Sequence, residues 1–154
     1  MERTLIILKP DAVHRLLVGR ILARFEDKGL RIAGMKLQQS PRAQVERHYA
    51  VHKGKPFYES LVQFMTAGPV ILAVLEGPAA ISVVRNLLGP TNGRDAPPGT
   101  SRGDFGLDQQ YNLVHASDGP ETARTEIDLF FRPEELFQYT RAPDSWIVRS
   151  DGQG

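Results

Sequence analysis

Apolar residues in this chain follow two spacings, which predict strands and helices in turn. Residues 4–8 form a continuous apolar run, typical of a buried central strand. Residues 31–38 and 70–75 predict two further strands, and residues 112–114 predict a short fourth one.

Residues at helical spacing fill the intervals between these strands. Gly29 is placed to end the first helix, and Pro78 to begin a later one. Pro41 opens another helix, on which His48 and His52 share a face. The residues that mark these helices are Val18, Ile21, Leu22 and Phe25; Val45 and Tyr49; Leu61, Phe64 and Met65; Ile81, Val84 and Leu88; and Ala123, Ile127, Phe130 and Phe131.

This alternating order is compatible with two architectures. One is a parallel α/β sheet, and the other is a ferredoxin-like antiparallel sheet with helices on one face. No internal repeat or domain boundary is evident, so we expect a single domain over residues 1–154, with a flexible tail over 147–154.

The segment 89–111 has little periodicity and is rich in glycine and proline. Unstructured stretches of this length within a domain are usually either functional or disordered. Phe105 and Leu107 favour a packed, functional loop, because a disordered segment has little use for large apolar residues.

Composition excludes several classes of protein. Lys and Arg number 19 against 18 for Asp and Glu, so a net charge of +1 gives no reason to expect a nucleic-acid or membrane partner. No apolar run is long enough for a signal peptide or a membrane span. We therefore expect a soluble, cytoplasmic protein whose anion sites come from local clusters.

The segment 112–118 carries a candidate nucleophile. His115 follows the predicted strand, and a helix-start pattern comes next, with Asp118 as the cap, Pro120 near the first position and Glu121 three residues on. A helix N-terminus attracts phosphate and disfavours a protonated imidazole. The alternative is a half-buried histidine that only hydrogen-bonds its neighbours.

Neither of the usual glycine-rich phosphate-binding motifs occurs in the sequence. Side chains would therefore have to bind any phosphate, and the candidates are Lys9, Arg85, Thr91 and Arg102. Arginine suits this task because its planar fork donates paired hydrogen bonds. Taken singly, each of these residues is equally compatible with a solvated surface position.

The run Asn112-Leu113-Val114-His115-Ala116-Ser117-Asp118 resembles the active-site sequence of the nucleoside diphosphate kinase family. Other segments agree with that family in order and spacing, from Arg3 to Trp146. They are Lys9-Pro10-Asp11, His48-Tyr49, Lys55-Pro56-Phe57, Gly89-Pro90-Thr91-Asn92, Pro98-Gly99-Thr100, Arg102-Gly103-Asp104-Phe105 and Pro133-Glu134-Glu135-Leu136.

The resemblance implies an α+β fold: a ferredoxin-like, four-stranded antiparallel sheet covered by helices, with a phosphate-site loop at about 89–111 and a C-terminal extension. It also implies transfer of the γ-phosphoryl group of ATP to a nucleoside diphosphate, through phosphohistidine at His115 and with ping-pong kinetics. Mg²⁺ would be the cofactor, bound mainly by the nucleotide phosphates, with no metal ligands from the protein. Dimers assembled into a hexamer or a tetramer would be the oligomeric state.

The resemblance also assigns roles to individual residues. Glu126 would orient the His115 ring, with Ser117 nearby and Tyr49 packed under it. Arg85, Thr91 and Arg102 would contact phosphates, and His52 matches a position that touches phosphate in some members. Lys9 and Asn112 would reach the sugar and phosphate region, and Phe57 would stack on the base beside Leu61.

Two features depart from the family pattern. Gln109-Gln110-Tyr111 replaces a more usual apolar-Gly-Arg sequence where the base is covered, which would affect base preference. Ala116 stands where glycine is commoner, and a positive φ there would cost on the order of 1 kcal/mol.

Two other classes of function remain compatible with the sequence. One is a regulatory nucleotide-binding module without turnover, and the other is a ferredoxin-like interaction domain without a ligand. The complete set of candidate residues favours the enzyme, namely Lys9, Arg85, Thr91, Arg102, Asn112, His115 and Glu126.

Overall fold

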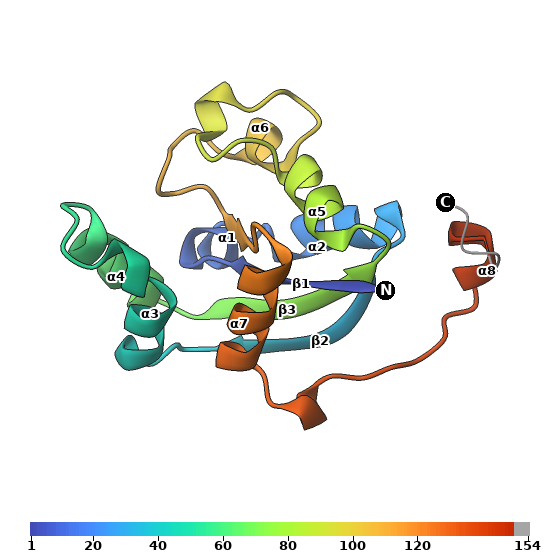
Figure 1. The fold of residues 1–154 in the computed structure, drawn as a ribbon. Coiled ribbons are helices and arrows are strands. Elements are labelled where there is room, and N and C mark those ends of the chain that lie inside the picture. The colour runs from blue at the N-terminus through green and yellow to red at the C-terminus, as the bar shows by residue number, and fades with distance from the viewer. Residues whose placement is uncertain (150–154) are drawn as a thin grey trace.

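A computed structural model describes residues 1–149 and contains one four-stranded sheet (Figure 1). The strands are β1 (Glu2–Leu8), β2 (Arg31–Gln38), β3 (Val70–Gly77) and β4 (Val114–Ala116), in the order β2-β3-β1-β4. Every neighbouring pair is antiparallel. The ferredoxin-like fold is therefore confirmed, and the parallel alternative is wrong.

Helices cover both faces of this sheet, so the expectation of helices on one face is wrong. Side chains alternate along β1: Ile6 and Leu8 belong to one apolar core, and Leu5 and Ile7 to the other. Because both faces of the strand are apolar, each needs a covering layer. Helices α2 (Val18–Lys28) and α5 (Ala80–Leu88) cover one face; α3 (Arg42–His48), α4 (Tyr58–Thr66) and α7 (Pro120–Phe130) cover the other.

Helix ends follow the local backbone. Helix α2 ends at Gly29, whose φ of 107° gives the left-handed cap that the sequence predicts. Helix α3 ends at His48, because the backbone leaves the helical region at Tyr49. His52 lies on a separate 3-10 turn, Ala50–His52, so the prediction that His48 and His52 share a face of one helix is wrong.

The strand that carries His115 begins later than predicted. The range 112–114 is wrong because β4 spans Val114–Ala116, and its hydrogen bonding to β1 continues to the amide of Ser117. This pairing delays the start of α7, so Gly119 is the N-cap and Pro120 the first helical residue. Asp118 is not the cap, and the predicted capping box is absent.

The segment between α5 and β4 is packed, as Phe105 predicts, whereas the same prediction for Leu107 is wrong. It contains a 3-10 turn, Gly93–Asp95, and the short helix α6 (Ser101–Phe105), which together form the lobe above the sheet in Figure 1. A Cβ atom on Gly103 would lie 1.9 Å from the Pro97 carbonyl oxygen, so the backbone there approaches closely. Phe105 packs partly buried against the core, whereas Leu107 is exposed.

After α7 and a 3-10 turn at Pro133–Glu135, the chain runs along β2 to the short helix α8 (Asp144–Ile147) (Figure 1). Arg141 donates hydrogen bonds to the carbonyls of Gly29 and Leu30. The start of the predicted tail at 147 thus lies in an anchored segment, and its residues 150–154 lie outside the described chain.

Helix α1 (Pro10–His14) follows β1 after the single residue Lys9. Among the described residues, no helix has the length and apolar character needed to cross a membrane.

Gly103 offers a test of the packed loop. We expect Gly103→Ala to destabilise the protein by roughly 1–3 kcal/mol, because the new methyl group must displace the Pro97 backbone. Urea denaturation measures the effect. Gly19→Ala is the control, since a Cβ atom there meets nothing within 4 Å. Equal stability of the two variants would contradict close packing at Gly103.

Candidate active site

His115 lies on β4, opposite Ile7 of β1, and its side chain is 22% exposed. Its Nε2 atom is 2.8 Å from Glu126 Oε2, and the Ser117 hydroxyl donates to Glu126 Oε1 at 2.7 Å. The expected contact with amides at the helix N-terminus is replaced by this carboxylate from α7. The structure thus brings together the three residues that the sequence proposes.

Burial alone would raise the pKa of Glu126. The hydrogen bond from His115 and its charge, together with the Ser117 bond, outweigh burial and lower that pKa below its ordinary value. Glu126 therefore remains a carboxylate at neutral pH. An ionised oxygen facing Nε2 favours the tautomer that carries its proton on Nε2.

His48 is the neighbour that sequence reasoning missed. Its ring meets the His115 ring edge-on, with 4.6 Å between centroids, and its Nδ1 lies 3.5 Å from Glu126 Oε2. Burial, then the charge of His115, lowers the pKa of His48 to about 3, so it is neutral. Tyr49 contacts the His48 ring, with centroids 4.4 Å apart. The pairing with His115 had no signal in the sequence beyond the His48-Tyr49 motif.

Lys9 and Asn112 form a buried pair between the end of β1 and the start of β4. The Lys9 ammonium donates to Asn112 Oδ1 at 2.9 Å, and the Asn112 amide donates to the Thr91 carbonyl at 3.0 Å. The side chain of Asn112 therefore links the central strand to the loop. Thr91 itself is exposed.

Arg102 is buried beneath the loop, and three of the five N–H groups of its guanidinium donate to the backbone. Its guanidinium donates to the carbonyls of Gly89, Asn112 and Val114. Burial, then the charge of Arg85, lowers the pKa of Arg102 to about 10. Arg85 is exposed and donates to the Ala116 carbonyl at 3.3 Å. The structure thus brings two guanidinium groups close to the backbone of β4.

Phe57 precedes α4 and leaves 46% of its surface exposed, so its ring is not part of the apolar core. His52 meets its ring at 5.2 Å, and Leu61 lies one turn further along α4, partly buried against the core. Ser60 of α4 and Gln110 are joined by a long hydrogen bond of 3.3 Å, and the ring of Tyr111 meets that of Phe64 at 4.7 Å. The departing sequence at 109–111 therefore lies against α4, the helix that Phe57 precedes.

Ala116 lies in β4 and its φ is not positive, so its backbone is unstrained. Its substitution for glycine therefore has no backbone cost at this position.

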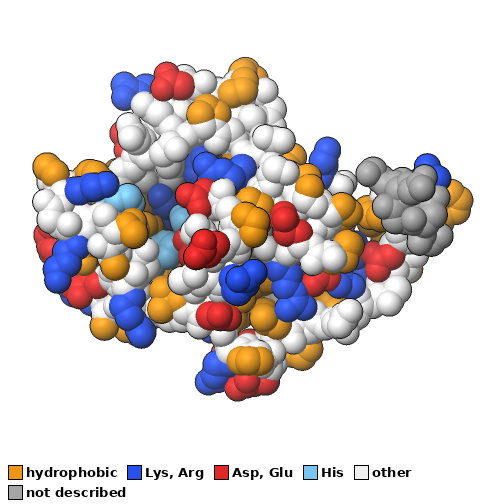
Figure 2. All heavy atoms as spheres, in the orientation of Figure 1, with side chains coloured by type: hydrophobic (Ala, Val, Ile, Leu, Met, Phe, Trp, Pro, Cys, Tyr) orange, Lys and Arg blue, Asp and Glu red, His pale blue; other side chains and the backbone are white. Residues whose placement is uncertain are grey.

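Figure 2 shows the site from one side: histidine and basic side chains line a hollow between the α3–α4 region and the lobe that carries α6.

In the described part of the chain, the candidate metal ligands that converge are His48, His115 and Glu126, with their ligand atoms within 4.8 Å of one another. Two of these three are nitrogen donors, whereas Mg²⁺ prefers six oxygen ligands. This donor set does not form a protein cage for Mg²⁺.

An imidazole set beside a carboxylate and surrounded by basic side chains is the arrangement expected of a phosphoryl-transfer enzyme. The sequence model described as "Nucleoside diphosphate kinase" matches residues 2–136. The chain belongs to the nucleoside diphosphate kinase family.

Individual relatives agree over nearly the whole chain. A nucleoside diphosphate kinase of Roseiflexus sp. (strain RS-1) is 55% identical, over 96% of this chain and 99% of its own. One from Thermococcus kodakarensis is 56% identical, over 97% and 87%. The solved nucleoside diphosphate kinase of Halobacterium salinarum in complex with CDP superposes with a TM-score of 0.93 at 44% identity, over 96% and 98%. A Babesia bovis family protein gives the same TM-score at 45% identity, over 96% and 100%.

The burial of the Lys9 ammonium makes the stability of the fold depend on pH. Burial, then the charge of Arg102, lowers its pKa to about 8 from 10.5. The unfolded chain therefore binds more protons between these two values, and stability rises with pH across that window. At pH 7 the buried charge destabilises the fold by on the order of 3 kcal/mol.

We expect Lys9→Met to stabilise the protein at pH 7 by about 1–2 kcal/mol, after allowing for the lost hydrogen bond to Asn112. The gain disappears above the ordinary pKa of lysine, 10.5. Urea denaturation at both pH values measures it, with the exposed Lys53→Met as control. If Lys9→Met is less stable than the parent at pH 7, the buried Lys9 charge does not destabilise the fold as argued.

Proposed function

We propose that this chain is a nucleoside diphosphate kinase that transfers the γ-phosphoryl group of ATP to a nucleoside diphosphate through phosphohistidine at His115. The observation that supports it most is the 2.8 Å contact between His115 Nε2 and Glu126. This contact occupies Nε2 and leaves Nδ1 as the nitrogen that reacts with phosphate. The site is built from one sheet and from the helices and loops that connect its strands, so we assign it to a single domain.

In the first half-reaction, the lone pair of Nδ1 forms a bond to the γ-phosphorus, and the bond from that phosphorus to the bridging oxygen breaks. A nucleoside diphosphate leaves with the bonding electrons. The ring becomes cationic, and Glu126 stabilises it through the Nε2 proton. The second half-reaction reverses these steps with another diphosphate, so the same site serves both substrates.

Charge stabilisation is assigned to basic side chains from the end of β1, from α5 and from α6. Lys9, Arg85 and Arg102 provide positive charge, with Thr91 and Asn112 as polar contacts to the phosphates and sugar. In this proposal Arg102 shares its guanidinium between phosphate and the carbonyls that it already binds. Mg²⁺ would supply further neutralisation of phosphate charge when it binds with the nucleotide.

The base would stack on Phe57 beside Leu61, with His52 at the edge of the ring. Stacking contributes roughly 1–3 kcal/mol per base and accepts any base, because every base has a π-face. Weak base selectivity follows from this mode of recognition. Gln109 and Gln110 would then add polar contacts where the family usually has an apolar cover.

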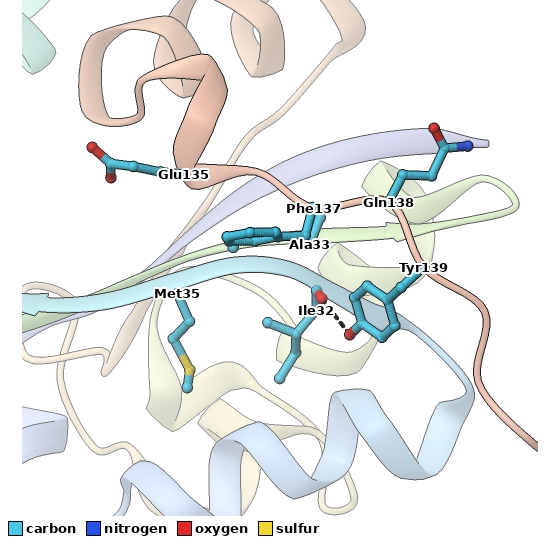
Figure 3. Close-up of a pocket in the computed structure, with 8 residues that line it drawn as sticks. Ile32, Ala33, Met35, Glu135, Phe137, Gln138 and Tyr139 are labelled. Atoms are coloured by element: carbon cyan, nitrogen blue, oxygen red, sulfur yellow. Dashed lines mark hydrogen bonds between the residues drawn. The ribbon is translucent and has the colours of Figure 1, made fainter.

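A homo-oligomer built from dimers, as a hexamer or a tetramer, is part of the proposal. It is supported by an exposed apolar groove along β2, lined by Met35, Phe137 and Tyr139 among others (Figure 3). Exposed apolar surface of this kind is typical of protein interfaces. We assign the enzyme to the cytoplasm, where its triphosphate substrates are found.

Labelling tests the proposed nucleophile. Incubation with γ-labelled ATP and Mg²⁺ should yield an acid-labile, base-stable phosphoprotein, and His115→Ala should abolish both label and phosphoryl exchange. The exposed His14→Ala serves as the matched control and should behave as the parent does. Full turnover by His115→Ala would refute the mechanism. Binding of ATP by the parent chain without any label would favour a regulatory nucleotide-binding module instead.

Arg102→Ala should lower kcat by roughly 10²- to 10³-fold, because a preorganised charge is lost from the transition state. Steady-state kinetics measures this loss, and Arg94→Ala, an exposed arginine of the same loop, is the control. Since Arg102 also binds three carbonyls, thermal unfolding of each variant must be followed in parallel. A folded Arg102→Ala variant with near-normal kcat would remove this residue from the mechanism.

A further inference from the structure

The backbone makes a strained turn at Leu113, two residues before His115. The Val114 amide donates to the Asn112 carbonyl at 2.8 Å, which closes a three-residue γ-turn centred on Leu113. The φ of Leu113 is 75°, and its side chain is fully buried. A γ-turn with positive φ is rare and strained, and such strain persists only where surrounding contacts fix it.

Asp11 provides one of these contacts from the first turn of α1. Its Oδ2 accepts a hydrogen bond from the Leu113 amide at 3.1 Å. The Leu113 carbonyl in turn accepts from the Lys9 amide at 2.8 Å. Both backbone groups of the strained residue are thus bound by the segment that directly follows β1.

The Asp11 carboxylate has one oxygen bonded to the Leu113 amide and one without a hydrogen-bond partner among the described residues. The latter oxygen, Oδ1, is buried. Burial raises the pKa of Asp11, against the opposing effects of the Lys9 charge and the Leu113 amide. A buried carboxylate with one unpartnered oxygen is costly, so a compensating role is expected.

We propose that Asp11 is a positioning residue for phosphoryl transfer, which fixes the γ-turn at Leu113 and so places Asn112 and His115 for reaction. The inference rests on the proposed function. Asn112 lies on one side of the turn and contacts Lys9. On the other side β4 begins at Val114, and the next residue, His115, is in register with Ile7. If the Leu113 amide is released, relaxation of φ moves both flanking residues.

A competing explanation is that Asp11 only stabilises α1, as an acid near a helix N-terminus. Glu121 provides the matched comparison. It is likewise an acid in the first turn of a helix that follows a strand of the site, but it is exposed and no side-chain bond from it to the γ-turn is described. Loss of helix stabilisation alone should therefore affect both acids similarly.

The experiment compares Asp11→Ala, Asp11→Asn and Glu121→Ala with the parent enzyme. Single-turnover phosphorylation of His115 by saturating ATP gives the rate, and amide hydrogen exchange of Leu113 reports the turn without nucleotide. We expect Asp11→Ala to slow phosphorylation by roughly 10- to 100-fold, as a misplacement of about 1 Å can do. Its Leu113 amide should lose protection.

Asp11→Asn retains an acceptor oxygen, so it should protect the Leu113 amide and keep the rate within about threefold of the parent. Glu121→Ala should leave both quantities unchanged. The inference is overturned if Asp11→Ala reacts as fast as the parent, or if a folded Asp11→Asn variant protects Leu113 yet loses the rate. If Asp11→Ala does not fold, Asp11→Asn alone decides. A parent enzyme that is never phosphorylated refutes the proposed function instead, whatever the exchange of Leu113 shows.

Discussion

The antiparallel pairing of β1 with β4 is the constraint on which the site depends. Strand β4 has only three residues, yet its register with β1 sets His115 opposite Ile7. The amide of Lys9 extends the same pairing to Leu113. Residues about 105 positions apart in the sequence are thereby joined by backbone bonds, which are more rigid than contacts between side chains alone.

The two apolar layers of the sheet explain how so short a strand is kept in place. Val114 and Ala116 belong to the core beneath α2 and α5, whereas His115 points to the opposite face. There α7 returns over the sheet and brings Glu126 to the imidazole. The alternation of side chains thus separates a stabilising face from a reactive one within three residues.

Much of the fold could be predicted from periodicity, and the exceptions have physical reasons. The strand at 31–38 was predicted with its observed bounds, and the helix marked by Val18 and Phe25 ends before Gly29 as predicted. Strand β4 is too short for periodicity to place, so its start was predicted two residues early. Helices on both faces were missed because a continuous apolar run does not say how many layers cover it.

The candidate site was predictable only in part for a similar reason. A resemblance between motifs indicates which residues matter, but not what each one touches. Glu126 and Ser117 lie where the resemblance implied, whereas the burial of His48 against His115 and the bond from Asp11 to Leu113 depend on tertiary contacts.

The buried basic groups show how strongly the site departs from an arrangement selected for stability alone. Lys9 and Arg102 both have lowered pKa values because burial disfavours their charged forms. A core chosen only for stability would replace Lys9 with an apolar residue of similar volume. Burial also removes water that would otherwise screen these charges, so in the proposed function the same environment that destabilises the fold would strengthen attraction for phosphate. An incoming anion offsets the repulsion among the cations, and we infer that nucleotide binding stabilises the fold most where the free protein is least stable.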